Sequence, residues 1–179
     1  MNIFWLDINT NLAAQYHVDK HVVKMILEYA QLLSTAHRLC DGIPFIGKSK
    51  TNRNVTRWRL PNTIDATIYQ ATHINHPSAV WTRQSANNYT ALWCLFHDVC
   101  KEYTYRYQKT HKIEATGLLE TLRTPPQNIA NGPFTQPTPA MSDEYKIPGD
   151  SIASYRAYYM GAKRTMAKWK NRPTPHWYE

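Results

Sequence analysis

The stretch that decides the fold is DKHVVKMILEYAQLLSTAHRL, residues 19–39. Apolar side chains recur in it at spacings of three and four and cover most of the circumference of a helix. A helix that is apolar nearly all round is buried in the middle of a domain. We therefore expect a central helix that begins with Asp19 as its N-cap and ends near Leu39, before Asp41 and Gly42.

A single polar stripe follows this helix at spacings of three and four. Its members are His17 or His21, Lys24, Glu28, Gln31, Thr35 and Arg38. Buried polar groups need partners, so the stripe is expected to face solvent or a polar cleft. A cleft would place Lys24 and Glu28 one turn apart on its wall. The alternative is a narrow solvated face with an ordinary ion pair between these two residues.

The rest of the chain is expected to be helical or irregular, because no alternating strand pattern competes with the helical spacing. Residues 43–61 are expected to form a basic loop, and 124–149, with six prolines and two glycines, a long Pro-rich irregular segment. The sequence thus predicts an all-α fold, a compact single-domain helical bundle over 1–179. Helices are expected over 12–16, 62–72, 77–84, 86–108, 113–122 and 151–170, the last followed by an aromatic tail.

Composition bounds the class of protein. The chain has 179 residues, of which 42% are hydrophobic, enough for the core of one domain. Its 21 Lys and Arg against 13 Asp and Glu give a net charge of +8, which favours a phosphate-bearing or other anionic partner. No apolar run is long enough to span a membrane and no signal peptide is recognisable, so we expect a cytoplasmic protein without a membrane partner. Three cysteines without a CxxC pair are typical of thiols in a reducing compartment.

The predicted basic loop carries five positive charges over 48–59 and no acid. Lys and Arg neutralise phosphates, and Trp58 between two arginines can stack on a base. We therefore expect Arg53, Arg57, Trp58 and Arg59 to bind an anionic ligand; the alternative is a solvated basic loop. The predicted last helix adds a second basic and aromatic surface, with Arg156, Lys163, Arg164, Lys168, Lys170 and Arg172 among Tyr155, Tyr158, Tyr159 and Trp169.

The segment 73–81 contains Asn75-His76-Pro77, in which Pro77 is expected to open a helix and Asn75 and His76 to point toward a phosphate beside the central helix. The two HxxH-like patterns lack a ligand set at metal-binding spacing, so no metal is expected. Without a Gly-rich phosphate loop or a nucleophile elbow, a P-loop, a Rossmann fold and a hydrolase triad are excluded, and no cofactor is expected. The remaining candidate ligand-binding residues are His17, Lys20, His21, Lys24, Gln31, Arg38 and Arg83.

Several of these stretches resemble known sequences. Residues 19–33, 73–81, 102–107, 141–146 and the closing helix are similar to uncharacterised proteins of tailed, especially marine, phages. More distantly, 19–31, Asn75-His76-Pro77 and 102–106 resemble the pyrimidine-dimer DNA glycosylase (endonuclease V-like) superfamily, as does the aromatic tail 169–179.

The resemblance implies a small, basic, helical protein that excises a base from damaged or modified DNA. Glu28, which matches the Glu of the superfamily, is the implied catalytic residue, with phosphates held by Lys24, Arg38 and residues 48–59. The family's lyase uses a free α-amine; here only the amine of Met1 can serve, because Asn2 is too large for ordinary Met removal. The host cytoplasm is the implied location.

Two hypotheses of other classes stay open. One is a non-catalytic phage protein that binds and sequesters a nucleotide-derived small molecule in the same cleft. The other is a structural or partner-binding protein whose polar stripe is covered by another element.

Overall fold

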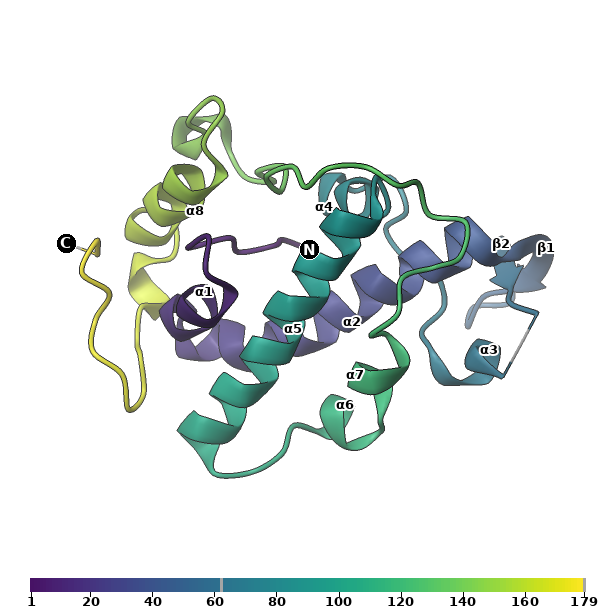
Figure 1. Ribbon diagram of the computed structural model, residues 1–179, viewed down its shortest axis with the longest axis horizontal. Helices are drawn as coiled ribbons and strands as arrows, with labels where there is room; N and C mark the ends of the chain where they lie inside the picture. The colour runs from purple at the N-terminus through teal and green to yellow at the C-terminus, as the bar shows by residue number, and fades with distance from the viewer. Residues whose placement is uncertain (62, 179) are drawn as a thin grey trace.

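Two long helices cross at the centre of the molecule, α2 (Asp19–Asp41) and α5 (Ala86–Tyr107), and pack on each other (Figure 1). The computed structural model describes residues 1–61 and 63–178. Helix α1 (Thr10–Tyr16) lies on α5, and α4 (Pro77–Thr82) lies on α2. The protein is mostly helical, as the spacing of apolar residues predicts.

Helix α2 is the buried centre that the sequence predicts. Val22, Ile26, Tyr29 and Leu33 are fully buried on it, in contact with the other helices. The predicted N-cap is wrong by one residue. Val18 is the N-cap, and its apolar side chain cannot accept a hydrogen bond. Asp19 instead lies in the first turn, and its backbone N–H donates to the carbonyl of Lys168 at 2.8 Å. A distant part of the chain therefore satisfies this helix end.

Three other helices begin with a residue whose side chain caps the first turn. The side chain of Asn9 accepts from the amides of Asn11 and Leu12 at the start of α1. Helix α5 begins after Ser85, whose hydroxyl accepts from an amide in the first turn. Before α4, His76 Nδ1 accepts from the amide of Ser78 at 3.2 Å. Each side chain satisfies an amide that the helix leaves free.

The predicted basic loop is wrong, because residues 43–59 form an antiparallel hairpin of β1 (Ile43–Lys48) and β2 (Asn54–Arg59). Its hexapeptides contain Ile, Val, Phe, Thr and Trp, which favour extended backbone. Its turn uses Asn52 in the left-handed region, at φ 59°, where Asn is tolerated. Ser49 N–H donates to the carbonyl of Arg53 at 2.9 Å and closes the turn. The fold is therefore mostly helical with a two-stranded sheet, not all-α.

Close approach fixes the root of the hairpin. A Cβ at Gly42 would collide with the carbonyl of Arg38 and lie 2.8 Å from Cβ of Trp58. Only glycine leaves room for β2 to pass this close to the end of α2.

The shorter helices differ from the expected bounds. The start of the predicted helix 62–72, Asn62, lies outside the described residues, and the helix found there is α3 (Ile64–Thr67). The predicted helix 113–122 is two, α6 (Lys112–Ala115) and α7 (Leu118–Thr121), separated by Gly117 at φ 78°. The predicted helix 151–170 is α8 (Ser151–Met160), which ends at Gly161; a 3-10 turn, η2 (Arg164–Met166), follows.

The Pro-rich segment 124–149 is irregular, as predicted, apart from the 3-10 turn η1 (Asp143–Tyr145). It runs across one end of α4 and α5 (Figure 1) and is tied to them by hydrogen bonds. Asn88 Oδ1 accepts from the amide of Thr135 at 2.9 Å, and the indole of Trp81 donates to the carbonyl of Thr135 at 3.0 Å. The segment is thus an ordered wrap over the helices. None of the described helices is long and apolar enough to cross a membrane.

Candidate functional site

Lys24 and Glu28 form the pair that the stripe predicts. Lys24 Nζ lies 3.0 Å from Glu28 Oε1, and the side chain of Lys24 is 67% exposed while that of Glu28 is 13% exposed. The carboxylate is therefore held close to the protein surface by a cation that reaches into solvent. This arrangement keeps the carboxylate of Glu28 at the protein surface, where a ligand can contact it.

His76 lies within electrostatic reach of Glu28. Burial lowers the pKa of His76, the α-ammonium group of Met1 and the ring of His73 lower it further, and the carboxylate of Glu28 opposes them. Because Nδ1 of His76 accepts the N–H of Ser78, the neutral ring carries its proton on Nε2. The charges of the Met1 amine, the Glu28 carboxylate and the His73 ring thus act on the ring of His76.

A backbone link holds the segment before α4 against α2. Thr35 Oγ1 donates to the carbonyl of Thr72 at 3.3 Å, and the amide of Thr72 lies 3.2 Å from the same hydroxyl. His73 follows at φ 49°, a left-handed conformation that is rare outside glycine. A strained, exposed His next to this link is typical of a functional position. Gln31, the next member of the stripe, is half-buried on the same helix.

A hollow of about 420 Å³ separates β2 from this segment. Arg57 and Trp58 line it on the strand side, and Thr72 and His73 line it on the other. His73 thus borders the hollow and also acts on His76. The hairpin and the segment before α4 thus share this hollow.

The hairpin carries uncompensated positive charge. Among the described residues, none of its five basic side chains takes part in an ion pair; they are Lys48, Lys50, Arg53, Arg57 and Arg59. The guanidinium of Arg59 lies over the ring of Phe45, 4.8 Å from its centroid. The basic surface that the sequence predicts at Arg53, Arg57, Trp58 and Arg59 therefore contains arginines without an ion-pair partner among the described residues.

Arg38 is a correction, because it cannot hold a phosphate. Its side chain is fully buried and donates five hydrogen bonds inside the protein. One guanidinium nitrogen donates to the carbonyl of Trp58 at 2.8 Å and to the carboxylate of Asp65. Others donate to the carbonyls of Tyr69 and Ile68. Arg38 therefore fixes the root of the hairpin to α2.

His17 and His21 are also corrected, because both are core residues. His17 is fully buried, with Nδ1 bonded to the carbonyl of Ala13 at 2.7 Å and Nε2 to the hydroxyl of Tyr29 at 2.9 Å. His21 is stacked on Phe4 and bonded to the hydroxyl of Tyr159 at 2.6 Å. Burial lowers the pKa of His17 to about 4 and that of His21 to about 3, so both rings are neutral at pH 7.

The other predicted ligand residues lie apart from one another. Lys20 is exposed on the first turn of α2, and Asn75 is exposed beside His76. Arg83 is the C-cap of α4; burial lowers its pKa and Cys40, near the C-terminal end of α2, opposes this shift. Among the described residues, no three His, Cys, Asp or Glu side chains converge as metal ligands would.

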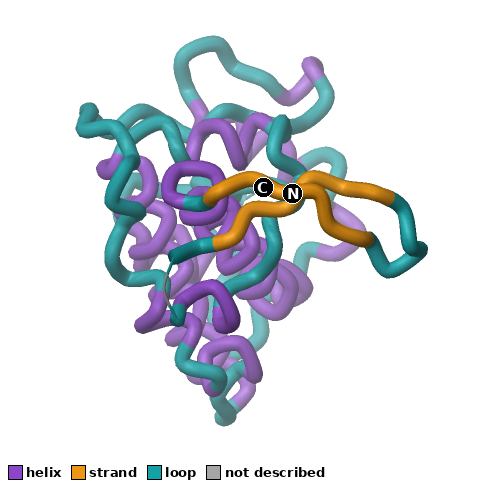
Figure 2. Tube along the Cα trace, turned by 90° about the vertical axis from the view of Figure 1, so that its right-hand side faces the viewer, coloured by secondary structure: helices purple, strands orange, loops and turns teal. Residues whose placement is uncertain are grey.

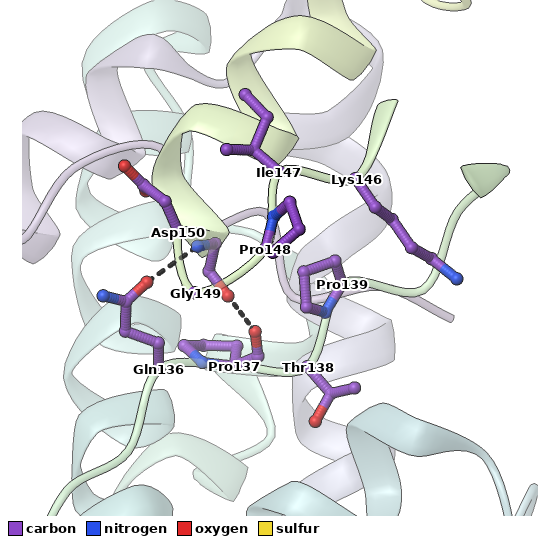
Figure 3. A pocket seen from close by; sticks show the side chains of 10 residues that line it. Gln136, Pro137, Thr138, Pro139, Lys146, Ile147, Pro148, Gly149 and Asp150 are labelled. Carbon is purple, nitrogen blue, oxygen red and sulfur yellow. Dashed lines mark hydrogen bonds between the residues drawn. The ribbon is translucent and has the colours of Figure 1, made fainter. Parts of the chain in front are cut away.

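Another hollow, of about 600 Å³, lies between residues 136–139 and 146–151 (Figure 3). Three proline rings line it, and Gln136 Oε1 accepts from the amide of Ser151 at 2.7 Å at its floor. It contains none of the predicted site residues.

Sequence reasoning missed two contributors, Thr72 and His73, as parts of one site with the hairpin. The sequence has His73 in the HxxH pattern, but the left-handed backbone and the link to Thr35 are tertiary features. The resemblance to phage proteins and to DNA glycosylases stays a prediction. Function is argued from the side chains themselves, because no protein-family model, no curated protein and no solved structure matches the chain.

Proposed function

We propose that this protein acts on DNA as a glycosylase-like enzyme that removes a damaged or modified base. The observation that carries the proposal is the cationic hairpin, whose basic side chains have no ion-pair partner among the described residues, beside a hollow bordered by Trp58 and His73. The hairpin supplies charge for the DNA backbone, which accounts for most of the affinity of a DNA-binding protein. Glu28 and His76 are the groups that supply chemistry.

Two side chains suit steps of base excision. As the anion of an ion pair, Glu28 can stabilise positive charge that develops on the sugar when the N-glycosidic bond breaks. The Nε2–H of the neutral His76 ring can donate a hydrogen bond to the departing base. Water adds to C1′, Glu28 takes the proton that the water loses, and the base leaves with that proton. An extruded nucleotide needs space, and the hollow beside Trp58 offers it.

The test is base release from ultraviolet-damaged and modified duplexes by wild type and Glu28→Gln. The variant keeps the shape and hydrogen bonding of the side chain but removes its charge. We expect nearly unchanged DNA affinity and a loss of turnover of roughly a hundredfold or more. Glu120→Gln is the control, since Glu120 is likewise a helical carboxylate paired with a basic residue, Arg123, but is exposed. No release by wild type from any substrate would exclude the enzyme.

One observation favours a second function, sequestration of a nucleotide-derived small molecule. The hollow of about 420 Å³ is of the size that small-molecule sites have, and it presents Arg57 for a phosphate and Trp58 for a base. Under this function Glu28→Gln leaves no turnover to lose. Mass spectrometry of whatever co-purifies with the protein distinguishes the two, because only a sequestering protein retains a free nucleotide.

A further inference from the structure

The hairpin packs neither of its faces fully on the helical body. Figure 2 shows its two strands leaving the helices and ending in a turn at the outer edge of the molecule. Ile43 and Ile46 point to opposite faces, yet they are 69% and 68% exposed. A two-stranded ribbon with two wetted faces gains little from its own burial, so its apolar and basic side chains are available to a partner.

The register sorts the side chains of the ribbon into two faces. Residues paired across the strands share a face, and alternate residues share it along a strand. One face carries Arg57 and Arg59 opposite Phe45 and Ile43. The other face carries Pro44, Ile46, Lys48, Asn54, Thr56 and Trp58.

The second face has the side chains that read base edges. Lys48 lies directly opposite Asn54, and Ile46 lies opposite Thr56, and all four are exposed. In a major groove, Lys donates to guanine, Asn bonds adenine at N6 and N7, and Ile or Thr contacts the methyl group of thymine. Basic side chains at the turn, Lys50 and Arg53, are placed for the phosphates that flank the groove.

We propose that the ribbon enters the major groove of double-stranded B-form DNA, with Lys48, Asn54 and Thr56 against the base edges. This inference rests on the proposed function only in that DNA is the partner. The major groove of B-form DNA, about 12 Å wide, admits a two-stranded β-ribbon. The deep, narrow major groove of an RNA duplex does not, and a single strand has no groove. The fixed root, where Arg38 holds the carbonyl of Trp58, keeps the ribbon in one orientation to α2.

The experiment uses the full chain and undamaged duplexes. A tight-binding sequence is selected from a randomised pool of DNA duplexes, and its purines are then replaced by 7-deazapurines. This substitution removes the N7 acceptor from the major groove and leaves base pairing unchanged. We expect wild type to bind the substituted duplex about tenfold more weakly, and to prefer the DNA duplex to the same sequence as RNA duplex or single strand.

The variant Asn54→Ala with Thr56→Ala should bind the unmodified duplex more weakly and be less sensitive to 7-deazapurines, the remaining sensitivity coming from Lys48. Its dependence on salt should stay that of wild type, since no phosphate contact is removed. The matched control is Asn131→Ala with Thr138→Ala, which removes the same exposed residue types from the Pro-rich segment. Wild type alone carries the 7-deazapurine comparison, so a variant that does not fold leaves the test intact.

The outcomes separate this inference from the proposed function. Equal affinity for substituted and unmodified duplexes, or equally tight binding of RNA duplex or single strand, overturns insertion in the major groove, while base release can persist. Sensitivity to 7-deazapurines without base release from any lesion supports the ribbon and overturns the enzyme.

Discussion

The hairpin and the C-terminal segment 156–178 are alike in composition and opposite in structure. Both combine basic and aromatic residues. In the C-terminal segment two of these charges are ion-paired: Arg156 pairs with Asp7 at 3.1 Å and lies over Trp177, and Arg172 pairs with Glu102 at 2.9 Å. Two lysines also lie over aromatic rings, Lys163 over Tyr158 and Lys170 over Tyr107. In the hairpin, Arg59 lies over Phe45, but none of the five basic side chains has an acidic partner among the described residues.

The difference teaches that basic and aromatic composition does not by itself indicate a binding surface. At the C-terminal end, carboxylates from other elements meet the cations, which stabilise the fold. Around the hairpin, the nearby acid Asp65 is already taken by Arg38. The position of acidic residues in three dimensions therefore decides which cations remain for a partner.

The largest loss of stability is expected from removing Arg106, whose buried guanidinium pairs with Glu102, the carboxylate that also binds Arg172. Arg106 bonds Glu102 at 2.6 Å and Asp19 at 2.8 Å, and it also donates to the carbonyls of His17 and Gln15. Removing one partner of a buried pair leaves an uncompensated charge. Arg106→Ala should lower the free energy of unfolding by about 3–5 kcal/mol, measured by denaturant titration. Lys112→Ala, an exposed control, should change it little; a loss below about 1 kcal/mol in Arg106→Ala would contradict the network.

The next largest effect comes from acid acting on His17. Burial, joined by the charge of Arg106, lowers its pKa from 6.5 to about 4 in the folded protein. Between these values the unfolded chain binds a proton and the folded chain does not, so stability falls as pH falls. The loss should reach about 3 kcal/mol by pH 4 and then stop growing from this group.

Thermal unfolding at pH 4 to 7 measures this loss. His17→Gln should be less stable at pH 7 and should show a pH dependence smaller by about one proton. An unchanged pH dependence would show that His17 is not neutral in the fold.

The role of the exposed hairpin charges in binding DNA is tested at Arg53, in the turn, and at Arg57, in β2. Arg53→Ala with Arg57→Ala should weaken DNA binding roughly tenfold or more. It should also reduce the slope of log affinity against log salt by about one to two, near 0.9 for each lost phosphate contact. Arg164→Ala with Lys168→Ala removes the same charge from the C-terminal segment and should leave the slope unchanged. Equal slopes in both double variants would erase the contrast between the two regions.

The smallest effect sharpens the contrast at single arginines. Arg172→Ala should destabilise the fold by about 1 kcal/mol, because Glu102 loses one of its two arginine partners. Arg53→Ala should change stability by less than about 0.5 kcal/mol, because its side chain is exposed and unpaired. The two melting temperatures, measured side by side, check the difference. A larger shift for Arg53→Ala would place its side chain in the fold rather than at the surface.

The helical part of the fold was predictable, because its signals are local. Asn9, Ser85, Pro77 and the apolar spacing of α2 mark helices by themselves. The hairpin was missed because both its faces are exposed, so no alternation of apolar and polar residues marks the strands. Its local signals were the β-branched and aromatic residues of 54–59 and Asn52 in the turn.

The candidate site was predictable only in part. The Lys24–Glu28 pair follows from helical spacing, since residues four apart face each other. The polar stripe does not form one exposed surface, because Arg38 and Thr35 form hydrogen bonds with carbonyls of the segment 58–72. Which polar residues of a helix are buried depends on the carbonyls and carboxylates that other segments bring to them, and spacing carries no information on those.

The bond from the amide of Asp19 to the carbonyl of Lys168 has a consequence for synthesis of the chain on the ribosome. Helix α2 emerges early, but the partner of its first turn is translated almost 150 residues later. At about 5–20 residues per second, this interval lasts roughly 7 to 30 seconds. During that time the indole of Trp169, which bonds the carbonyl of Tyr16, is also missing, and Arg106 is missing for the first part of it. The first turn of α2 and the end of α1 therefore lack these hydrogen-bond partners on the nascent chain, and a chaperone that shields α2 would act in this interval.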